Sequence, residues 1–291
     1  MAISIEFWGV RGSIPTPGYS TARYGGNTPC VSLERDDSDG RHVIVLDAGT
    51  GIRGLGNSLV QRANGDLKVD LLISHTHWDH IQGLPFFGPF FEKGNKVRIL
   101  GPRQGKVNLV RILTEQMNQV VFPVPLRGLP AELHVEHVDE TGFSVDGFEV
   151  SAHRLRHPAT TLGYRLKPTG GGPEIAYLSD NELGIGGEYD VKPSWREDIV
   201  RFLKGTDVLV HDAMYAPDEV EMHRGWGHSS YEEAVALASQ AGVDQLVLFH
   251  HRPEHDDVAV DAILESARAL AAKQSSKLEV VAAAEGLKLT L

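Results

Sequence analysis

The sequence predicts a layered α/β fold, and three observations support it. Short apolar or alternating segments, typical of strands, recur along the chain and are interleaved with fewer segments of helical spacing. The 31 glycines and 15 prolines separate these segments at short intervals, without an internal repeat or a long linker. The 291 residues are 41% hydrophobic, which is enough to bury a sizeable core. We therefore expect one domain, residues 1–291, built from two halves.

The first half is predicted to be rich in strands. Ile3–Trp8 is interpreted as a strand, and a glycine- and proline-rich loop follows from Gly9 to Pro29. The apolar run Val69–Ile73 predicts a buried strand, and an Asp-Gly turn is expected at Asp36–Gly40. The other expected elements are the strands Val31–Glu34, Val43–Leu46 and Val97–Leu100, and a helix within Gln104–Val121 with apolar residues at Val107, Val110, Leu113 and Met117.

The second half alternates strands and helices more regularly. Helices are expected at Ser194–Lys204, from Ser230 to about Gln240, and at the alanine-rich Asp257–Lys273. The expected strands are Leu133–Val135, Phe148–His153, Leu162–Leu166, Ile175–Ser179, Val208–Val210, Gln245–Phe249, Leu278–Ala282 and Leu287–Leu291.

Composition excludes several classes of protein. A formal net charge of −11 argues against a broad nucleic-acid footprint, which needs a basic stripe. The single cysteine, Cys30, excludes an internal disulfide and a cysteine-based zinc cage. No run of eighteen apolar residues predicts a membrane span, and the first residues resemble a strand rather than an export signal. We therefore expect a cytoplasmic protein with no membrane partner.

Histidine is the compositional outlier, with 14 residues, and it points to a metal site. Ser74-His-Thr-His-Trp-Asp-His80 directly follows the apolar run Val69–Ile73. It places four metal-ligand side chains within six residues at the end of a buried strand. Imidazole nitrogen and carboxylate oxygen are ligands that zinc accepts. The alternative, a solvated histidine-rich loop, rarely has this density of ligands.

The pattern His-x-His-x-Asp-His after a strand resembles the metallo-β-lactamase fold superfamily. The resemblance implies a four-layer αββα sandwich with one or two metal ions at its edge. It implies that His75 and His77 bind one ion, while Asp79 and His80 bind a second. The superfamily then supplies a further histidine, a bridging aspartate and a last histidine, which match His157, Asp180 and His250.

Some of these assignments have rivals. His153 competes with His157 but is expected within a strand, whereas His157 is expected in a loop. His251 competes with the aligned His250. Asp180 could instead be a turn residue in Asp-Asn. In the superfamily, an aspartate at the position of Asp47 supports the metal loop from behind, but a plain turn aspartate before glycine is nearly as good an interpretation.

Two further segments resemble loops of ribonuclease Z and related phosphodiesterases. They are Gly225-Trp-Gly-His228-Ser-Ser and Val208-Leu-Val-His-Asp212-Ala. The resemblance implies that Asp212 orients His228, which protonates the leaving oxygen or holds a phosphate. Ser230-x-x-Glu233 is also a capping box, so Glu233 is left out of the site.

The chain departs from ribonuclease Z in one place. That enzyme usually carries a long arm for tRNA between the residues that match His157 and Asp180. Here the interval predicts only strand, turn and strand, with Gly170–Pro173 as the turn. With the acidic charge, this argues against tRNA as a partner. The aromatic run Phe86–Phe91 could stack a base, but packing in the core or a subunit interface is the favoured interpretation.

We therefore expect a dinuclear metal-dependent hydrolase. His77 replaces the carboxylate of redox di-iron members, which favours hydrolysis with zinc, or alternatively manganese. The substrate class expected is a small phosphodiester, such as a cyclic nucleotide, attacked by a metal-bridging hydroxide that Asp79 orients. The resemblance extends to a bacterial branch whose members tend to be labelled metal hydrolases or cyclic-nucleotide phosphodiesterases. The alternative function is hydrolysis of a carboxylic ester, lactone, thioester or β-lactam. A third hypothesis is a metal-bound scaffold or sensor without enzymatic activity. For the oligomeric state we expect a homodimer, the commonest assembly.

Overall fold

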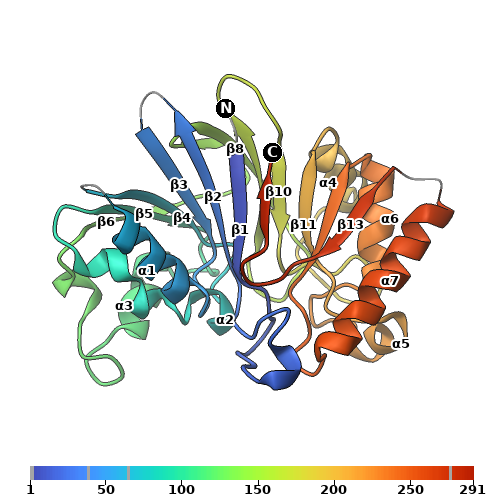
Figure 1. The fold of residues 1–291 in the computed structure, drawn as a ribbon, viewed down its shortest axis with the longest axis horizontal. Coiled ribbons are helices and arrows are strands. Elements are labelled where there is room, and N and C mark those ends of the chain that lie inside the picture. Colours follow the sequence, from blue (N-terminus) through green and yellow to red (C-terminus); the bar gives the residue numbers. More distant parts are fainter. Residues whose placement is uncertain (1–2, 38–39, 64–65, 275–276) are drawn as a thin grey trace.

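The computed structural model describes residues 3–37, 40–63, 66–274 and 277–291. Within these residues, two seven-stranded sheets pack face to face (Figure 1). The first sheet has the order β14-β1-β2-β3-β4-β5-β6, and the second has the order β13-β12-β11-β10-β9-β8-β7. Strands from the two chain ends, β1 and β14, pair antiparallel at one edge of the first sheet.

Three apolar clusters separate the layers. One lies between the sheets and includes Phe7, Tyr177 and Phe249. The second joins the outer face of the first sheet to α1 and α3, and the third joins the outer face of the second sheet to α4, α6 and α7. Helix, sheet, sheet and helix therefore form four layers, which confirms the predicted αββα sandwich.

The strands are bounded as follows: β1 Ile3–Gly9, β2 Cys30–Asp37, β3 Gly40–Leu46, β4 Lys68–Leu72, β5 Lys96–Gly101, β6 Glu132–His137, β7 Phe143–Val145, β8 Phe148–Arg154, β9 Leu162–Pro168, β10 Ile175–Leu178, β11 Val208–Asp212, β12 Gln245–Phe249, β13 Glu279–Ala282 and β14 Lys288–Thr290. The α-helices are α1 Ile52–Arg62, α2 Trp78–Ile81, α3 Leu109–Gln116, α4 Trp195–Leu203, α5 Pro217–Val220, α6 Tyr231–Ala241 and α7 Asp257–Lys273.

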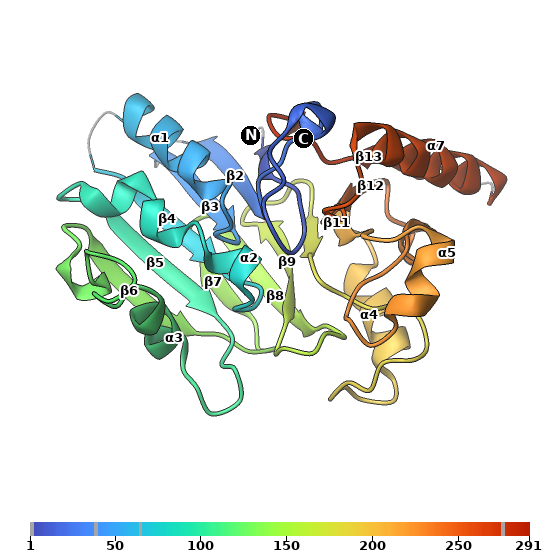
Figure 2. The same cartoon turned by 90° about the horizontal axis from the view of Figure 1, so that it is seen from below.

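Four consecutive strands on one side of each sheet are parallel. β3, β4, β5 and β6 run in one direction in the first sheet, and β10, β11, β12 and β13 do so in the second. Parallel strands bring their carboxyl ends to one edge, where open α/β sheets place their sites. The short helix α2 follows β4 at this edge, which is the lower one in Figure 1 and faces the viewer in Figure 2.

Most predicted elements are present, with several differences, and the four-residue helices α2 and α5 are among the elements that were not predicted. The helix expected within Gln104–Val121 is shorter: the Asn108 side chain accepts a hydrogen bond from the Arg111 amide and starts α3 there, and the helix ends at Gln116. The prediction missed α1, which has a glycine N-cap and two internal glycines, and it missed the three-residue β7. The turn expected at Asp36–Gly40 includes residues 38–39, which lie outside the described part of the chain.

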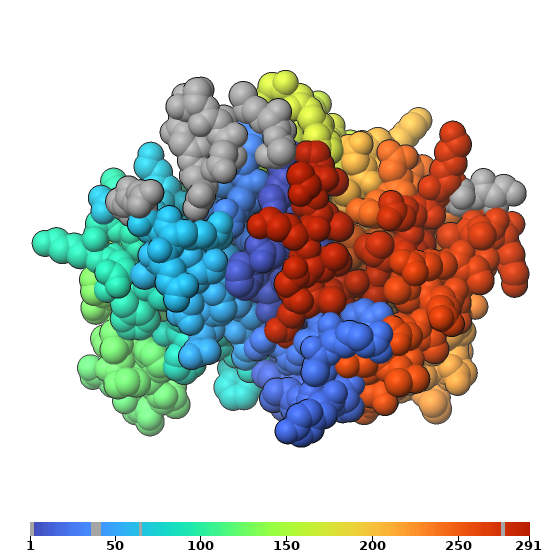
Figure 3. All heavy atoms as spheres, viewed as in Figure 1, coloured from blue at the N-terminus to red at the C-terminus, as the bar shows by residue number. Residues whose placement is uncertain are grey.

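The loop from Gly9 to Pro29 packs along the amino-terminal end of α7. Arg23 forms an ion pair with Asp261, and the Tyr24 hydroxyl donates to the same carboxylate at 2.8 Å. Figure 3 shows this blue loop against the orange-red surface of α7. The loop is thereby fixed beside the carboxyl ends of the strands. Among the described residues, no helix combines the length and apolar character needed to cross a bilayer.

Candidate metal centre

The predicted ligands meet at the carboxyl-end edge of both sheets. The first four follow β4: His75 and His77 lie in the loop that leads into α2, and Asp79 and His80 lie within α2. The others come from separate strand ends of the second sheet: His157 lies between β8 and β9, Asp180 follows β10, and His250 follows β12. The parallel packing of β10, β11 and β12 explains why residues so far apart in sequence become neighbours.

A first ligand group consists of His75, His77, His157 and Asp180, whose ligand atoms all lie within 4.8 Å of one another. Asp180 Oδ2 is 3.6 Å from His75 Nε2 and 3.8 Å from His157 Nε2. His77 Nδ1 lies 2.9 Å from His157 Nε2. Three imidazoles and one carboxylate therefore converge on a volume of the size that one ion needs.

A second ligand group consists of Asp79, His80 and His250. The other oxygen of Asp180, Oδ1, lies 3.1 Å from His80 Nε2 and 3.3 Å from His250 Nε2. Asp180 thus directs one oxygen to each group, which is the geometry of a bridging carboxylate. The Nε2 atoms of His75 and His80 are buried and have no hydrogen-bond partner. Buried polar atoms without partners are costly, and two divalent ions would satisfy them. The residues therefore fit the metal centre that the sequence predicts.

The outward nitrogens of three ligand rings are held from behind. His80 Nδ1–H donates to Asp47 at 2.8 Å, and His157 Nδ1–H donates to the Gly227 carbonyl at 3.1 Å. His75 Nδ1 lies 3.1 Å from Ser74 Oγ, which itself donates to Asp47. These contacts fix the proton on Nδ1 and orient each ring so that Nε2 faces the metal centre.

Asp47 is a buried supporting residue rather than a plain turn aspartate. Its carboxylate accepts hydrogen bonds from the amide and hydroxyl of Ser74 and from the Tyr177 hydroxyl, as well as from His80. It does so from a left-handed backbone conformation, with φ of 60°. The supporting role that the resemblance implied therefore agrees with the observed contacts.

Backbone strain is concentrated at this centre. The non-glycine residues with positive φ among those described are Ser13, Asp47 and His250. The Ser13 amide donates to Asp79 Oδ2 at 2.8 Å. Gly12 lies so close to His250 that a Cβ there would be 2.5 Å from its ring. Strain of this kind persists where the surrounding structure enforces it, typically at functional sites.

The electrostatics favour ligand-ready protonation states at His75, His157 and Asp180. Burial opposes a charge on His80, but the nearby aspartate carboxylates, Asp180 foremost, outweigh it and hold the pKa of this ring well above its ordinary value. Burial, followed by the charge of His80, holds the pKa of His75 well below its ordinary value. Burial lowers the pKa of His157 to about 3. Burial opposes ionisation of Asp180, but the neighbouring histidines His250 and His80 hold its pKa well below the usual range. Neutral imidazoles beside ionised carboxylates are the forms that bind metal.

The predicted pair Asp212 and His228 is formed beside the two ligand groups. His228 Nδ1 lies 2.6 Å from Asp212 Oδ2, at the end of β11. The His228 ring stacks on His250, with centroids 5.1 Å apart. Burial opposes a charge on this imidazole, but the Asp212 carboxylate outweighs it and raises the pKa of His228 to about 9. Asp212 therefore holds the ring with Nε2 left for another partner.

The structure separates the rival residues. His153 lies away from both ligand groups, 3.5 Å from Glu140 and stacked on Phe202. His251 points elsewhere, 2.8 Å from the Ala283 carbonyl. Ser230 and Glu233 form the capping box of α6. Only His157 and His250 of the competing histidines therefore belong to a ligand group among the described residues.

The sequence analysis missed three supporting residues: Ser13, Tyr177 and Glu182. Ser13 and Tyr177 contact Asp79 and Asp47. Glu182 is fully buried and accepts hydrogen bonds from the amides of Gly225 and Gly227, next to His228. The available signal was position, since Glu182 lies two residues after Asp180, and a buried carboxylate needs partners.

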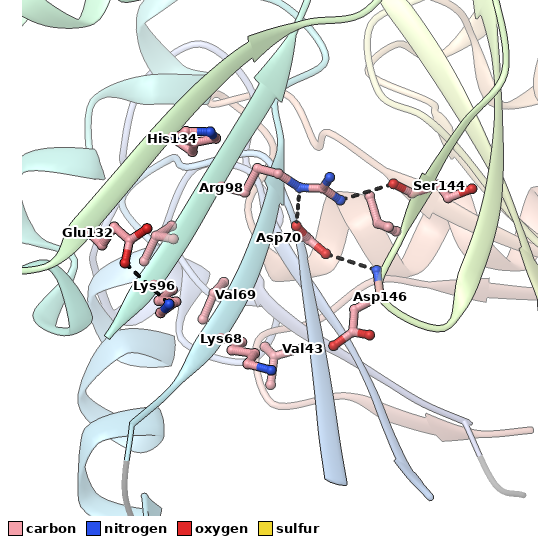
Figure 4. Close-up of a pocket in the computed structure, with 12 residues that line it drawn as sticks. Val43, Lys68, Val69, Asp70, Lys96, Arg98, Glu132, His134, Ser144 and Asp146 are labelled. Atoms are coloured by element: carbon pink, nitrogen blue, oxygen red, sulfur yellow. Dashed lines mark hydrogen bonds and ion pairs between the residues drawn. The ribbon is translucent and has the colours of Figure 1, made fainter. Parts of the chain in front are cut away.

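Two other features lie apart from the metal centre. A cavity of about 450 Å³ opens at the amino ends of β4 and β5, and the ion pairs Arg98–Asp70 and Lys96–Glu132 line it (Figure 4). None of the predicted site residues lines it. The aromatic run Phe86–Phe91 is divided: Phe87 and Phe90 are buried in the core, which agrees with packing, while Phe86 and Phe91 are exposed.

Fold and site together define an αββα sandwich with a histidine- and aspartate-rich metal centre at its edge. A family model described as a beta-lactamase superfamily domain matches residues 42–251, and the chain belongs to this superfamily. It is similar to ribonuclease Z from Staphylococcus saprophyticus, with 22% identity over 310 residues that cover 92% of this chain and 94% of that protein. The chain is a metal-dependent hydrolase with the metallo-β-lactamase fold.

Two solved structures show the same fold. Unliganded yeast PDE1 superposes with a TM-score of 0.73 at 17% identity and covers 100% of this chain and 99% of its own. A diphosphatase from the PhnP family superposes with a TM-score of 0.68 at 18% identity, covering 100% and 98%. The similarity therefore extends over the whole length of the chain.

Proposed function

We propose that the protein is a dinuclear metal-dependent phosphodiesterase that acts on a small, cyclic or open, phosphodiester. One observation carries the proposal: the Asp212–His228 pair lies against the ligand groups, with His228 Nδ1 4.0 Å from Asp180 Oδ2. A phosphodiester needs a proton on its leaving oxygen, and this pair is placed to deliver one. Hydrolysis of lactones or thioesters does not require such a group.

The first and second ligand groups would hold two divalent ions. When bound, such ions activate water at neutral pH and stabilise charge on phosphoryl oxygens. We propose zinc, with manganese as the alternative, because nitrogen and oxygen donors suit both ions.

The chain's own residues divide the remaining work. Asp79 is fixed by the Ser13 amide, so its carboxylate keeps one orientation toward the reacting centre. His228 donates a proton from Nε2 to the leaving oxygen, and Asp212 stabilises the imidazolium before that transfer. The raised pKa of His228, to about 9, keeps the ring protonated at neutral pH. These roles match general acid catalysis with a positioned acid.

The proposed substrate is small rather than a tRNA. Between His157 and Asp180 the described chain forms the antiparallel pair β9 and β10, joined by a short turn with Gly170 and Gly171 at positive φ. This leaves no inserted arm in that interval. The net charge of −11 also disfavours a long polyanion.

The test is hydrolysis of bis(p-nitrophenyl) phosphate by protein loaded with zinc or manganese. The wild type should turn over and Asp79→Asn should lose activity. His228→Ala should lose most activity on a phosphodiester with a poor leaving group, such as a cyclic nucleotide, and less on the p-nitrophenyl ester, whose leaving oxygen needs little protonation. His153→Ala is the matched control, because it removes a histidine outside the ligand groups. No turnover by a fully loaded wild type, with turnover of a lactone or thioester instead, would replace the proposal with its alternative.

A further inference from the structure

Two tryptophans beside the metal centre are exposed to solvent. Trp78 is 75% exposed, although it stands between the ligand residues His77 and Asp79. Trp226 is 62% exposed and stands two residues before His228. Indole rings are large apolar surfaces that proteins usually cover. The Trp226 ring meets His223 edge-on, with ring centroids 5.1 Å apart, but most of the surface of both indoles remains open to a partner from outside the chain.

The segments that carry the two tryptophans meet at His157. The Nε2 of this ring is 2.9 Å from the His77 side-chain Nδ1, and its Nδ1 is 3.1 Å from the Gly227 carbonyl. One imidazole ring thus separates the residue before Trp78 from the residue after Trp226. Trp78 and Trp226 are therefore each one residue away from an atom that contacts His157 of the first ligand group.

The loop that carries Trp226 is held firmly. The buried carboxylate of Glu182 accepts hydrogen bonds from the Gly225 amide at 2.8 Å and the Gly227 amide at 3.1 Å. The same carboxylate accepts one from the Tyr189 hydroxyl at 2.6 Å. Both glycines have positive φ, and a Cβ on Gly227 would lie 2.0 Å from His157 Nδ1. An anchored loop therefore presents its indole in a fixed place.

The edge around the tryptophans is apolar and has little free positive charge. Ile14, Ile185 and Met222 are 58%, 94% and 77% exposed on the neighbouring segments. In residues 12–16, 76–82, 182–188 and 221–230, the only lysine or arginine is Arg224, and it is paired with Glu221 and Glu233. This surface suits a planar, uncharged group better than additional phosphates.

We propose that Trp78 and Trp226 bind the base of a nucleotide substrate while its phosphodiester occupies the metal centre. The proposal rests on the proposed function and narrows it to nucleoside phosphodiesters. Stacking on an aromatic ring recognises any base by its flat face, so it selects a nucleotide without selecting its sequence. The acidic chain and the apolar edge together favour a single nucleotide over a polymer.

The test compares two substrates that release the same p-nitrophenolate. One is thymidine 5′-(p-nitrophenyl phosphate), and the other is methyl p-nitrophenyl phosphate, which has no base. Trp226→Ala should raise KM for the thymidine ester about tenfold or more, as expected for loss of one stacked base. The same variant should change KM for the methyl ester, which has no base to stack, by less than about twofold. Trp226→Phe should restore most of the affinity. Phe91→Ala, which removes an exposed ring elsewhere, should change neither.

Three outcomes would overturn the subsite: equal effects on both esters, no effect on either, or conversion of a dimer into a monomer by Trp226→Ala. The last would make this edge an interface between copies of the chain. Calorimetry distinguishes failure of the proposed base subsite from failure of the proposed phosphodiesterase activity. If the loaded protein cleaves no phosphodiester, tighter binding of thymidine 5′-monophosphate than of ribose 5-phosphate, lost in Trp226→Ala, still supports the subsite. Equal binding of the two overturns it.

Discussion

The two halves of the protein build the metal centre in different ways. The first half supplies His75, His77, Asp79 and His80 from one short segment, the loop after β4 and the helix α2, and Asp47 holds this segment from behind. The second half supplies its residues one at a time, from the ends of separate strands. The first contribution is local and therefore rigid over a few residues. The second depends on the packing of the whole sheet.

The halves meet at Asp180, whose two oxygens face the two ligand groups. Its position depends on β10 pairing with β9 and β11. A local motif can thus bring four ligand side chains together, but only the sandwich completes the centre. Substitutions at Asp180, at His228 and behind the ligands test this division.

Removing the residue shared by both halves should have the largest effect. Asp180→Asn keeps the shape but loses the charge that serves both ligand groups. We expect kcat/KM to fall by at least about 10³-fold, because losing several kcal/mol of charge stabilisation has that effect. Metal content should fall in parallel, as measured by mass spectrometry of the elements. Two retained ions with a rate within tenfold would contradict the bridging position.

His228→Ala tests the second half without touching the first. We expect kcat to fall about 10²–10⁴-fold with a poor leaving group, since general acids contribute about this much. Esters of p-nitrophenol should suffer less, because their leaving oxygen needs little protonation. Both ions should remain bound. Loss of an ion in this variant would instead make His228 a ligand, for which its place in the group Asp180, Asp212, His228 and His250 leaves room.

The supports behind the ligands should matter less than the ligands. Asp47→Asn weakens the hold on His80 and should lower metal affinity about 10–100-fold. Competition with a chromogenic chelator measures this affinity. Gly12→Ala is the counterpart for the second half, because its Cβ would press on His250. An Asp47→Asn protein with unchanged affinity would show that the loop after β4 needs no support.

The rival histidine gives the smallest expected effect. His153→Gln should leave metal content and kcat unchanged, because the ring lies with Glu140 and Phe202. His157→Gln, compared under the same conditions, should lose part of the bound metal. Equal losses in the two variants would contradict the separation that the structure shows.

The sequence predicted the local half of the centre more fully than the distributed half. His75–His80 is readable because its density of ligands is improbable by chance. Asp180 and His250 needed the order of residues in a known superfamily, and the only local argument for His157 over His153 was its expected place in a loop. The fold decides between the rivals: His153 lies within β8, and His251 contacts the Ala283 carbonyl. The single-domain organisation stays a prediction.

The supports were harder to predict for a physical reason. Glu182 and Ser13 act through backbone amides, and any residue can supply an amide, so the sequence carries little signal. The helix α1 was missed because its glycines and its uncapped start obscure the pattern of Ile52, Leu55 and Leu59. The helix predicted within Gln104–Val121 corresponds to α3, but the predicted range was longer than the helix, because the N-cap at Asn108 was not recognised.

Metal stoichiometry tests the central claim most directly. The wild type is loaded with excess zinc, freed of loosely bound ions by gel filtration and measured for zinc per chain. We expect two ions per wild-type chain. We expect about one ion in His77→Ala, which loses a ligand of the first group, and about one in His250→Ala, which loses a ligand of the second group. One ion in the wild type, or loss of both ions in only one variant, would contradict a centre shared by the two halves.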